Sequence, residues 1–335
     1  MEHKTMIELQ DLAVGYRSRR GIKVVADAIN GTICRGELTC LLGTNGVGKS
    51  TLLRTLSAFQ PKLGGGIYIN GKELDEYTGR QLARLIGVVL TERPEVHNLS
   101  VSDLIGLGRS PYTGFWGGLD EVDREVVQKA VALVGIEGLM GRMTDMLSDG
   151  ERQKVMIAKA LAQETPIILL DEPTAFLDFP SKVEIMQLLH RLSRQMQKTV
   201  FLSTHDLDLA LQLADKVWLM GEGGSLAVGT PEDLALDGVL AKFFLRKGIA
   251  FDGQAGSFRV ANECTCKIRL CGTNPRVAMV KKALRRNGIE AGDEVQSDTC
   301  IEVDEEHYLL NRPGQPLQTA STVEELLQLL AISSS

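Results

Sequence analysis

Residues 37–56, ELTCLLGTNGVGKSTLLRTL, decide the fold of this chain. Within them, residues 43–50 match G-x-x-x-x-G-K-[ST], the pattern of a loop whose backbone N–H groups cradle phosphates. Residues 37–42 predict a strand that leads into the loop, and residues 51–56 predict a helix that continues it. The N-terminus of such a helix directs N–H groups at an anion. The sequence therefore predicts a nucleotide-binding site that comprises Gly43, Thr44, Asn45, Gly46, Val47, Gly48, Lys49, Ser50 and Thr51.

Two side chains of this loop have specific roles in the pattern. Lys49 would reach the β- and γ-phosphates, and the Ser50 hydroxyl would bind Mg²⁺. The alternative is a glycine-rich turn that binds nothing. The flanking strand and helix favour the phosphate site over that alternative.

A second candidate site follows the apolar run at 167–170, where Asp171 and Glu172 stand at the carboxyl end of a predicted strand. Ligands bind at this end of the strands in open α/β sheets. Asp171 is placed to hold the magnesium shell, and Glu172, on the opposite face of the strand, can polarise an attacking water. Read alone, such a pair is more typical of a solvated strand end, and the upstream loop favours the functional interpretation.

The alternation of short apolar runs with amphipathic stretches predicts an α/β fold with a parallel sheet and crossover helices. Strands are expected at 6–9, 24–28, 37–42, 67–69, 167–170, 199–203 and 216–220, with turns at Asn30-Gly31 and Asn70-Gly71. Helices are expected at 120–134, 152–161, 181–197 and 207–214.

The composition excludes several classes of protein. Of the 335 residues, 44% are hydrophobic and 24% charged, as in soluble globular proteins, which argues against a disordered or coiled-coil chain. The net charge of −6 provides no overall positive field for nucleic acid. No apolar run approaches the roughly 18 residues of a spanning helix, so a membrane role would need a partner that crosses the bilayer. Sparse cysteines and the lack of a visible secretory signal lead us to expect a cytosolic location.

The stretch LSDGERQ at 147–153 lies between the two candidate sites and resembles the signature of the ATP-binding-cassette (ABC) ATPases. The resemblance spans about residues 5–250 and includes, in the family's order, DEPT at 171–174, AFLD at 175–178 and STHD at 203–206. It implies a P-loop ABC ATPase domain over residues 1–255. In that domain a parallel core sheet is joined by an antiparallel β-subdomain and by a helical subdomain at about 92–165, and the ligands are ATP and Mg²⁺.

The resemblance also implies the roles of individual residues. Glu172 would be the principal catalytic base, and His205 would be the switch residue that contacts the γ-phosphate. Asp178 would belong to the D-loop, and Tyr16 would stack on adenine. Without the resemblance, a histidine at a strand end or an isolated aromatic is more often a packing residue.

The signature itself predicts a contact with a second subunit. Ser148 and Glu151 match a capping box, so the helix that follows would present free N–H groups and a positive dipole end. Capping alone is the alternative explanation. The resemblance implies that the signature residues, with Ser148 and Gly150 at the γ-phosphate, complete the site of the opposite subunit. Because the chain has one cassette, the expected partner is a second copy in a head-to-tail homodimer. The signature residues are Ser148, Asp149, Gly150 and Glu151.

One position departs from the family pattern. A glutamine that links the magnesium site to the transmembrane partner commonly follows the strand predicted at 87–90, and this chain has Thr91-Glu92-Arg93 there. By spacing Thr91 takes the place of the glutamine, whereas Glu92 is the nearest side chain long enough to substitute for it. The reach of its carboxylate leads to the hypothesis that Glu92 takes the magnesium-side role.

The stretch LGRSPY at 107–112 resembles the helical subdomain of importers for iron-siderophore, haem and cobalamin. A local packed loop is the alternative. The importer interpretation predicts an ATPase at the cytoplasmic face of the inner membrane, bound peripherally to a permease that works with a periplasmic or surface substrate-binding protein. Nucleic acid is not an expected partner. A soluble ABC ATPase that acts on DNA or ribosomes, or a P-loop kinase for a small metabolite, would be the rival functions.

The last part of the chain, residues 256–335, is expected to form a separate small α+β appendage. Strands are predicted at 264–270 and 300–303, and helices at 275–286 and 322–330. Cys264, Cys266, Cys271 and Cys300 lack the paired C-x₂-C spacing of a structural zinc site, so ordinary free thiols are expected. A regulatory or dimer-stabilising role for the appendage is a hypothesis.

Overall fold

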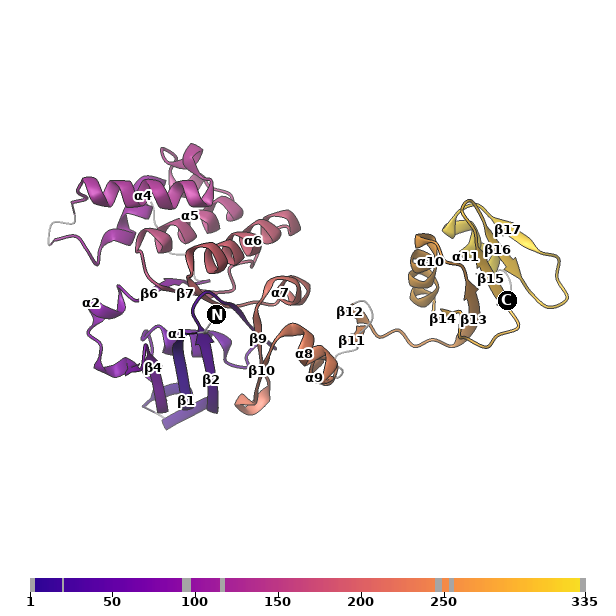
Figure 1. Ribbon diagram of the computed structural model, residues 1–335, viewed down its shortest axis with the longest axis horizontal. Coiled ribbons are helices and arrows are strands. Elements are labelled where there is room, and N and C mark those ends of the chain that lie inside the picture. Colours follow the sequence, from indigo (N-terminus) through magenta and orange to yellow (C-terminus); the bar gives the residue numbers. More distant parts are fainter. Residues whose placement is uncertain are drawn as a thin grey trace. The chain divides into compact units, whose positions relative to one another are not determined.

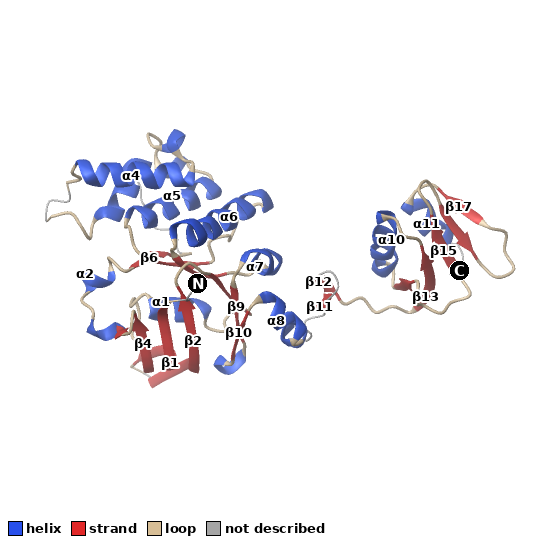
Figure 2. Cartoon of the chain, in the orientation of Figure 1, coloured by secondary structure: helices blue, strands red, loops and turns tan. Residues whose placement is uncertain are grey.

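The computed structural model describes residues 4–19, 21–91, 98–114, 118–244, 249–252 and 256–331. The chain forms two compact units. The first runs to Phe244 and includes Phe251–Phe258, and the second comprises the chain from Arg259 onward together with Leu245–Ala250. Figures 1 and 2 show the elements of each unit. Among the described residues, every helix is too short or too polar to span a bilayer.

The core of the first unit is a six-stranded sheet in the order β10-β9-β3-β8-β7-β6. Its strands run parallel except for β10, which pairs with β9 in the antiparallel sense. The carboxyl ends of β3, β7 and β8 therefore meet at one edge, as the sequence predicts for the two candidate sites. The strands are β3 (Leu38–Gly43), β6 (Ile86–Val89), β7 (Ile167–Asp171), β8 (Thr199–Ser203), β9 (Lys216–Met220) and β10 (Leu226–Gly229).

A separate antiparallel sheet has the order β2-β1-β4-β5. Its first two strands are each 14 residues long, so the short strands expected at 6–9 and 24–28 are only parts of them. The expected turn at Asn70-Gly71 is confirmed, because both residues have positive φ and join β4 to β5. The strands are β1 (Thr5–Ser18), β2 (Gly21–Cys34), β4 (Gly64–Ile69) and β5 (Lys72–Glu73).

The turn expected at Asn30-Gly31 is wrong, since β2 continues through it to Cys34. The Asn30 amide donates a hydrogen bond to Asp11 Oδ1 at 2.8 Å, across to the neighbouring strand. Gly31 lies against the indole of Trp218, and a Cβ on Gly31 would come within 2.7 Å of that ring. The glycine therefore serves a close approach between elements rather than a turn.

The helices of the first unit include those expected at 120–134, 152–161, 181–197 and 207–214, which are confirmed as α4 to α7. Helices α3, α4 and α5 pack together as a helical group. The helices are α1 (Lys49–Leu56), α2 (Gly79–Leu82), α3 (Val101–Gly106), α4 (Glu121–Val134), α5 (Asp149–Ala162), α6 (Phe179–Met196), α7 (Leu207–Leu213), α8 (Pro231–Leu236) and α9 (Val239–Phe244). Short 3₁₀ helices occupy Leu74–Glu76, Leu107–Arg109, Glu137–Leu139, Thr144–Met146 and Glu222–Gly224.

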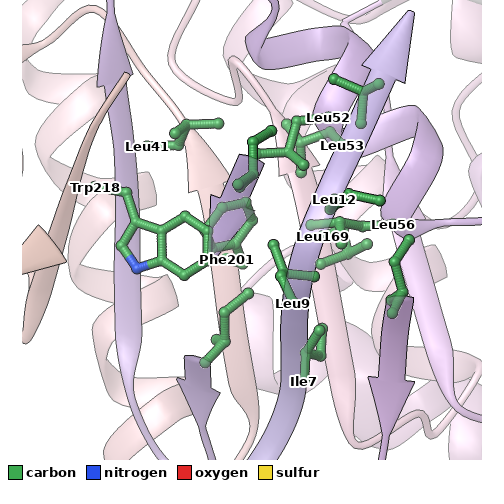
Figure 3. Packing of buried hydrophobic residues seen from close by; sticks show 14 of the residues in the cluster. Ile7, Leu9, Leu12, Leu41, Leu52, Leu53, Leu56, Leu169, Phe201 and Trp218 are labelled. Atoms are coloured by element: carbon green, nitrogen blue, oxygen red, sulfur yellow. The ribbon is translucent and has the colours of Figure 1, made fainter. Parts of the chain in front are cut away.

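One hydrophobic core joins both sheets of the first unit to helix α1 (Figure 3). Apolar residues from both sheets and Leu52, Leu53 and Leu56 of α1 belong to the same buried cluster. At its centre, the ring of Phe201 meets that of Trp218 edge to face, with the centroids 5.2 Å apart. This core holds the helix that follows the glycine-rich loop in a fixed position beneath it.

Replacing Trp218 by alanine is expected to lower the free energy of unfolding of the first unit by about 3–5 kcal/mol, because the indole is fully buried and the neighbouring side chains can fill only part of the cavity. Urea unfolding followed by far-ultraviolet circular dichroism measures the effect. The matched control is Leu236→Ala, at a side chain that is 86% exposed, which should change stability by less than about 0.5 kcal/mol. Equal stability of the two variants would contradict this core assignment.

The stretch at 107–112 packs within the helical group. Arg109 is buried and forms ion pairs of 2.8 Å with both Asp123 and Glu164. Its guanidinium also lies over the ring of Tyr112, whose hydroxyl donates to the carbonyl of Gln163. For Arg109 and Tyr112, the local packed loop is the interpretation that the contacts support.

A hairpin formed by β11 (Ile249–Asp252) and β12 (Ser257–Val260) follows α9, and its central part, Phe251–Phe258, belongs to the first unit. Phe258 of β12 packs edge to face on Phe244 of α9 and on Phe251 of β11, with centroid distances of 4.7 and 5.1 Å. These ring contacts attach the hairpin to the end of α9.

The second unit is a five-stranded mixed sheet in the order β14-β13-β15-β16-β17, with two helices. Strand β13 runs parallel to β14 and β15, and β16 is antiparallel to its neighbours. The expected strands and helices are present, and β14, β16 and β17 are additional. The elements are β13 (Cys266–Cys271), α10 (Pro275–Arg286), β14 (Ile289–Gly292), β15 (Cys300–Val303), β16 (Tyr308–Asn311), β17 (Gln318–Ala320) and α11 (Val323–Ala331).

The four cysteines of the second unit are free thiols. Cys264 and Cys266 are exposed, and the Sγ atoms of Cys271 and Cys300 lie 3.8 Å apart on neighbouring strands. Burial raises the pKa of Cys271 to about 11, so its thiol stays protonated at neutral pH. Within the described part of the chain, no group of three or more histidine, cysteine, aspartate or glutamate side chains is arranged to hold a metal ion.

Candidate functional site

The glycine-rich loop joins β3 to α1, as the sequence predicts. Gly46 and Gly48 have φ of 78° and 116°, which side chains other than glycine rarely adopt. A Cβ on Gly43 would lie 2.6 Å from the carbonyl oxygen of Met220, so this position also requires glycine. Gly48 is the N-cap of α1 and has no side chain to cap the helix, and the first-turn N–H groups of such a helix can bind an anion.

The side chain of Lys49 is folded back into the loop. Lys49 is 5% exposed, and its Nζ donates to the carbonyl oxygens of Gly43 and Thr44 at 3.1 and 3.3 Å. It also lies 3.4 Å from Nε2 of His205. The loop and the segment after β8 therefore bring a lysine and a histidine side chain close together.

The acidic strand end is joined to the loop through Asp171. The Ser50 hydroxyl donates to Asp171 Oδ1 at 3.1 Å, and Ser203 Oγ donates to the same oxygen at 2.6 Å. Ser203 Oγ in turn accepts the backbone N–H of Glu172 at 3.0 Å. A serine hydroxyl next to a carboxylate is the hard oxygen donor set that Mg²⁺ prefers.

Glu172 and His205 form a direct pair at the carboxyl ends of β7 and β8. His205 Nε2 lies 2.7 Å from Glu172 Oε1, and the two side chains are 44% and 27% exposed. The backbone of Glu172 has φ of 49°, an uncommon conformation for a side chain of this kind. Strained backbone of this type is concentrated at functional sites. The pair is therefore held in place and reachable from solvent.

A cavity of about 540 Å³ brings these groups together. Tyr16 of β1 lies at its wall, 46% exposed, and its hydroxyl is 2.9 Å from Thr51 Oγ1. An aromatic ring at this position can stack on a base. The cavity lining is Tyr16, Lys23, Val25, Asn45, Gly46, Gly48, Lys49, Ser50, Thr51, Glu172 and His205.

The signature lies at the N-terminus of α5 and does not belong to this lining. The predicted capping box is present, since Glu151 N–H donates to Ser148 Oγ at 3.3 Å and Ser148 N–H donates to Glu151 Oε2 at 2.8 Å. The Ser148 backbone N–H and, second, the Ser148 hydroxyl, which donates to Glu151 Oε2 at 3.0 Å, hold the pKa of Glu151 below its ordinary value. Asp149 and Gly150 form the first turn.

Asp178 of the predicted D-loop is the N-cap of α6. Its Oδ1 accepts the backbone N–H of Ser181 at 3.1 Å, and hydrogen bonds from Ser181 lower the pKa of Asp178. The carboxylate is therefore ionised at neutral pH and stabilises the start of the helix.

Thr91 stands where the family commonly has glutamine, and a hydrogen bond to the main chain holds its side chain. The Thr91 hydroxyl donates to the carbonyl oxygen of Asp171 at 2.7 Å. Thr91 thus contacts the main chain of Asp171, the residue predicted to hold magnesium. Glu92, the second candidate for this role, lies outside the described residues.

Three contributors to the site had no predicted role: Ser203, and Lys23 and Val25 of β2. Ser203 bridges Asp171 and the backbone of Glu172, and Lys23 of β2 lines the cavity. In the sequence, Ser203 could have been noticed as the polar residue that ends the apolar run at 199–203. Lys23 had no such signal, because only the pairing of β1 with β2 places it beside Tyr16.

Family models match both parts of the chain. Residues 26–175 match the ABC transporter model, and residues 265–331 match the iron ABC transporter C-terminal domain. An ABC transporter ATP-binding protein of Methanocaldococcus jannaschii is 38% identical over 257 residues, covering 77% of this chain and 87% of that protein. The iron(3+)-hydroxamate import ATP-binding protein FhuC of Bacillus subtilis is 34% identical, covering 71% and 87%.

A solved structure agrees with the fold. The dimeric structure of MJ0796, a bacterial ABC transporter cassette, superposes with a TM-score of 0.60 at 27% identity. The match covers 67% of this chain and 98% of the cassette.

Proposed function

This chain belongs to the ABC transporter family, and we propose that it is the ATP-hydrolysing subunit of an importer for an iron chelate. The observation that carries the proposal is that Lys49, Glu172 and His205 line one cavity together. A relative that imports iron(3+)-hydroxamate and the match to the iron ABC transporter C-terminal domain support the class of substrate. These relatives do not favour a soluble ATPase that acts on DNA or ribosomes.

The geometry supports a division of roles during hydrolysis. The backbone N–H groups of the loop and the Lys49 ammonium would bind the ATP phosphates. Glu172 would accept the proton of the attacking water, and His205, paired with it at 2.7 Å, would orient this carboxylate at the γ-phosphate. Tyr16 would stack on adenine.

Ser50 and Asp171 would hold Mg²⁺, which neutralises charge on the β- and γ-phosphates when it is bound. The hydrogen bond from Ser50 to Asp171 already brings these two oxygen donors together. Ser203 also donates a hydrogen bond to the Asp171 carboxylate and so helps to orient it for the metal.

The signature residues would act on a second copy. Because the N-terminus of α5 is outside the cavity lining of its own chain, we propose that Ser148 and Gly150 complete the site of the opposite subunit in a head-to-tail homodimer. The dimeric structure of the MJ0796 cassette supports this arrangement. Asp178 would lie at the same interface.

The remaining partner is a permease. A groove of about 500 Å³ lies beside Phe59, which is 63% exposed, and continues along Leu82, Ala83 and Ile86 to Gln163 of the helical group. An exposed apolar groove with polar rims is typical of an interaction site. We assign it to the permease, which would hold the chain peripherally at the cytoplasmic face of the membrane. A periplasmic or surface substrate-binding protein would complete the importer.

Thr91 and Glu92 stay the candidates for coupling between the permease and the magnesium site. The contact of Thr91 with Asp171 supports a coupling through the main chain. Any shift of the segment at Thr91 would then act on the backbone of Asp171.

We expect the full chain to co-purify with a multispanning permease and to drive ATP-dependent uptake of a ferric siderophore. The experiment isolates the tagged chain from its own cells, identifies the co-purified membrane protein, and measures uptake in vesicles that contain both. Labelled ferric siderophore, haem and cobalamin are tested in parallel. Uptake of cobalamin alone would overturn the iron assignment, and sedimentation with ribosomes or DNA but never with membranes would overturn the importer function.

A further inference from the structure

Asp206, the residue directly after His205, links three segments of the chain. Its Oδ1 accepts Lys182 Nζ at 2.8 Å, and its Oδ2 accepts the hydroxyl of Thr174. Its backbone N–H donates to Thr204 Oγ1 at 3.0 Å. Thr174 and Thr204 are buried, and the side chains of Lys182 and Asp206 are 27% and 22% exposed. This is a partly desolvated ion pair with a second hydrogen bond, which stabilises one geometry better than an exposed pair does.

The orientation of this carboxylate runs against local helix preference. Asp206 occupies the N-cap of α7, where an aspartate normally accepts a first-turn N–H and stabilises the helix by about 1 kcal/mol. Here the side chain makes no capping hydrogen bond. It turns instead to α6 and to the segment after β7, so its contacts serve the tertiary structure rather than its own helix.

The contacts of Asp206 with Lys182 and Thr174 fix the C-terminal side of the segment 204–206, which we call the histidine loop. On the other side of His205, the backbone N–H of Thr204 donates to the carbonyl of Leu41 at 3.1 Å, which anchors the loop to β3. The imidazole itself is 44% exposed, so packing around the ring contributes little to its position. The two anchors, together with the approach of Lys49 Nζ to His205 Nε2 at 3.4 Å, therefore position this nitrogen against Glu172 Oε1.

The same link reaches the helix that starts at the D-loop. Lys182 lies in the first turn of α6, and its backbone N–H donates to the carbonyl of the N-cap Asp178 at 3.0 Å. If Asp178 moves, Lys182 should move with it. The ion pair of Lys182 with Asp206 would then shift the segment that carries His205.

We propose that Lys182 and Asp206 are positioning residues that hold His205 against Glu172 and connect its placement to the D-loop. The proposal rests on the proposed ATPase function of the cavity. Neither residue belongs to the lining of the cavity at the phosphate loop, so we expect their loss to act on the position of His205 rather than on the ATP contacts of the loop. Misplacement of a catalytic group by about 1 Å can cost roughly 100-fold in rate.

The test compares three variants of the full chain. Asp206→Asn and Lys182→Met each remove the ion pair, and we expect kcat for ATP hydrolysis to fall about 10-fold in both. Lys182→Arg retains the pair and should keep kcat within about twofold. The dissociation constant for ATP should stay unchanged in all three. A cavity of about 420 Å³ next to Lys182 and Asp206, walled by Phe179 and Phe258, gives the new side chains room.

The matched control removes a different ion pair from the same helix. Glu184→Gln removes the ion pair of Glu184 with Lys154 of α5, which is 2.7 Å long and involves neither Lys182 nor Asp206, and kcat should not change. Wild-type kcat in both Asp206→Asn and Lys182→Met would overturn the proposal, as would an equal loss in Lys182→Arg or a parallel loss of ATP affinity. A wild-type chain that hydrolyses no ATP would instead reject the proposed function.

Discussion

Replacing Glu172 by glutamine is expected to lower the rate of ATP hydrolysis by about 10²–10⁴-fold while ATP still binds. Glutamine keeps the size of the side chain and can still pair with His205, whose Nε2 lies 2.7 Å from the present carboxylate. It cannot accept the proton of an attacking water. Without hydrolysis the ATP-bound form should accumulate as a dimer, because two bound nucleotides would stay clasped between two copies.

Phosphate release measures the rate, and sedimentation with ATP and Mg²⁺ measures the oligomeric state. The matched control is Glu121→Gln, an exposed residue at the start of α4, which should hydrolyse ATP at the wild-type rate. Wild-type hydrolysis by Glu172→Gln would place the base elsewhere. A variant that stays monomeric in ATP would reject the dimer.

Replacing Lys49 by alanine is expected to weaken ATP binding by about 10- to 100-fold, with a larger loss in hydrolysis. Hydrogen bonds to charged groups contribute about 1.5–3 kcal/mol each, which corresponds to this range of affinity. Lys49 is 5% exposed, and its Nζ is held by the carbonyl oxygens of Gly43 and Thr44 at the point where the phosphates would lie. Its charge is therefore already in place before ATP arrives.

Equilibrium titration with ATP measures the affinity of this variant. Lys62→Ala serves as the control, because Lys62 forms ion pairs with Glu73 and Asp75 outside the cavity lining. Its ATP affinity should equal that of the wild type. An unchanged affinity in Lys49→Ala would show that the phosphates bind elsewhere.

The parts of the fold that the sequence predicted are those with strong local constraints. The glycine-rich loop can be recognised from a short run of the sequence. Its conformation needs positive φ at positions 46 and 48, and both of these residues are glycine. Fully buried strands such as β7 appear as continuous apolar runs. The capping box of Ser148 and Glu151 spans only four residues and was equally visible in the sequence.

The residues that the sequence misplaced or missed are those whose neighbours in space come from distant parts of the chain. Asn30-Gly31 has the composition of a turn, and its place inside β2 depends on Trp218, which is far along the sequence. The additional strands β14, β16 and β17 are three or four residues long and alternate in burial, so their apolar signal is weak. The packed position of Arg109 likewise depends on Asp123 and Glu164.

The sequence by itself determined which residues can bind a phosphate, donate an oxygen to a metal or cap a helix, because these properties depend on residue type and on backbone conformation over a few positions. Only the tertiary structure decided which of them meet. The pairing of Glu172 with His205, the backbone contact of Thr91 and the turn of Asp206 toward Lys182 join segments from different strands and helices. Such contacts are set by the order and register of the parallel strands and by the packing of α6 against them, which no local pattern encodes.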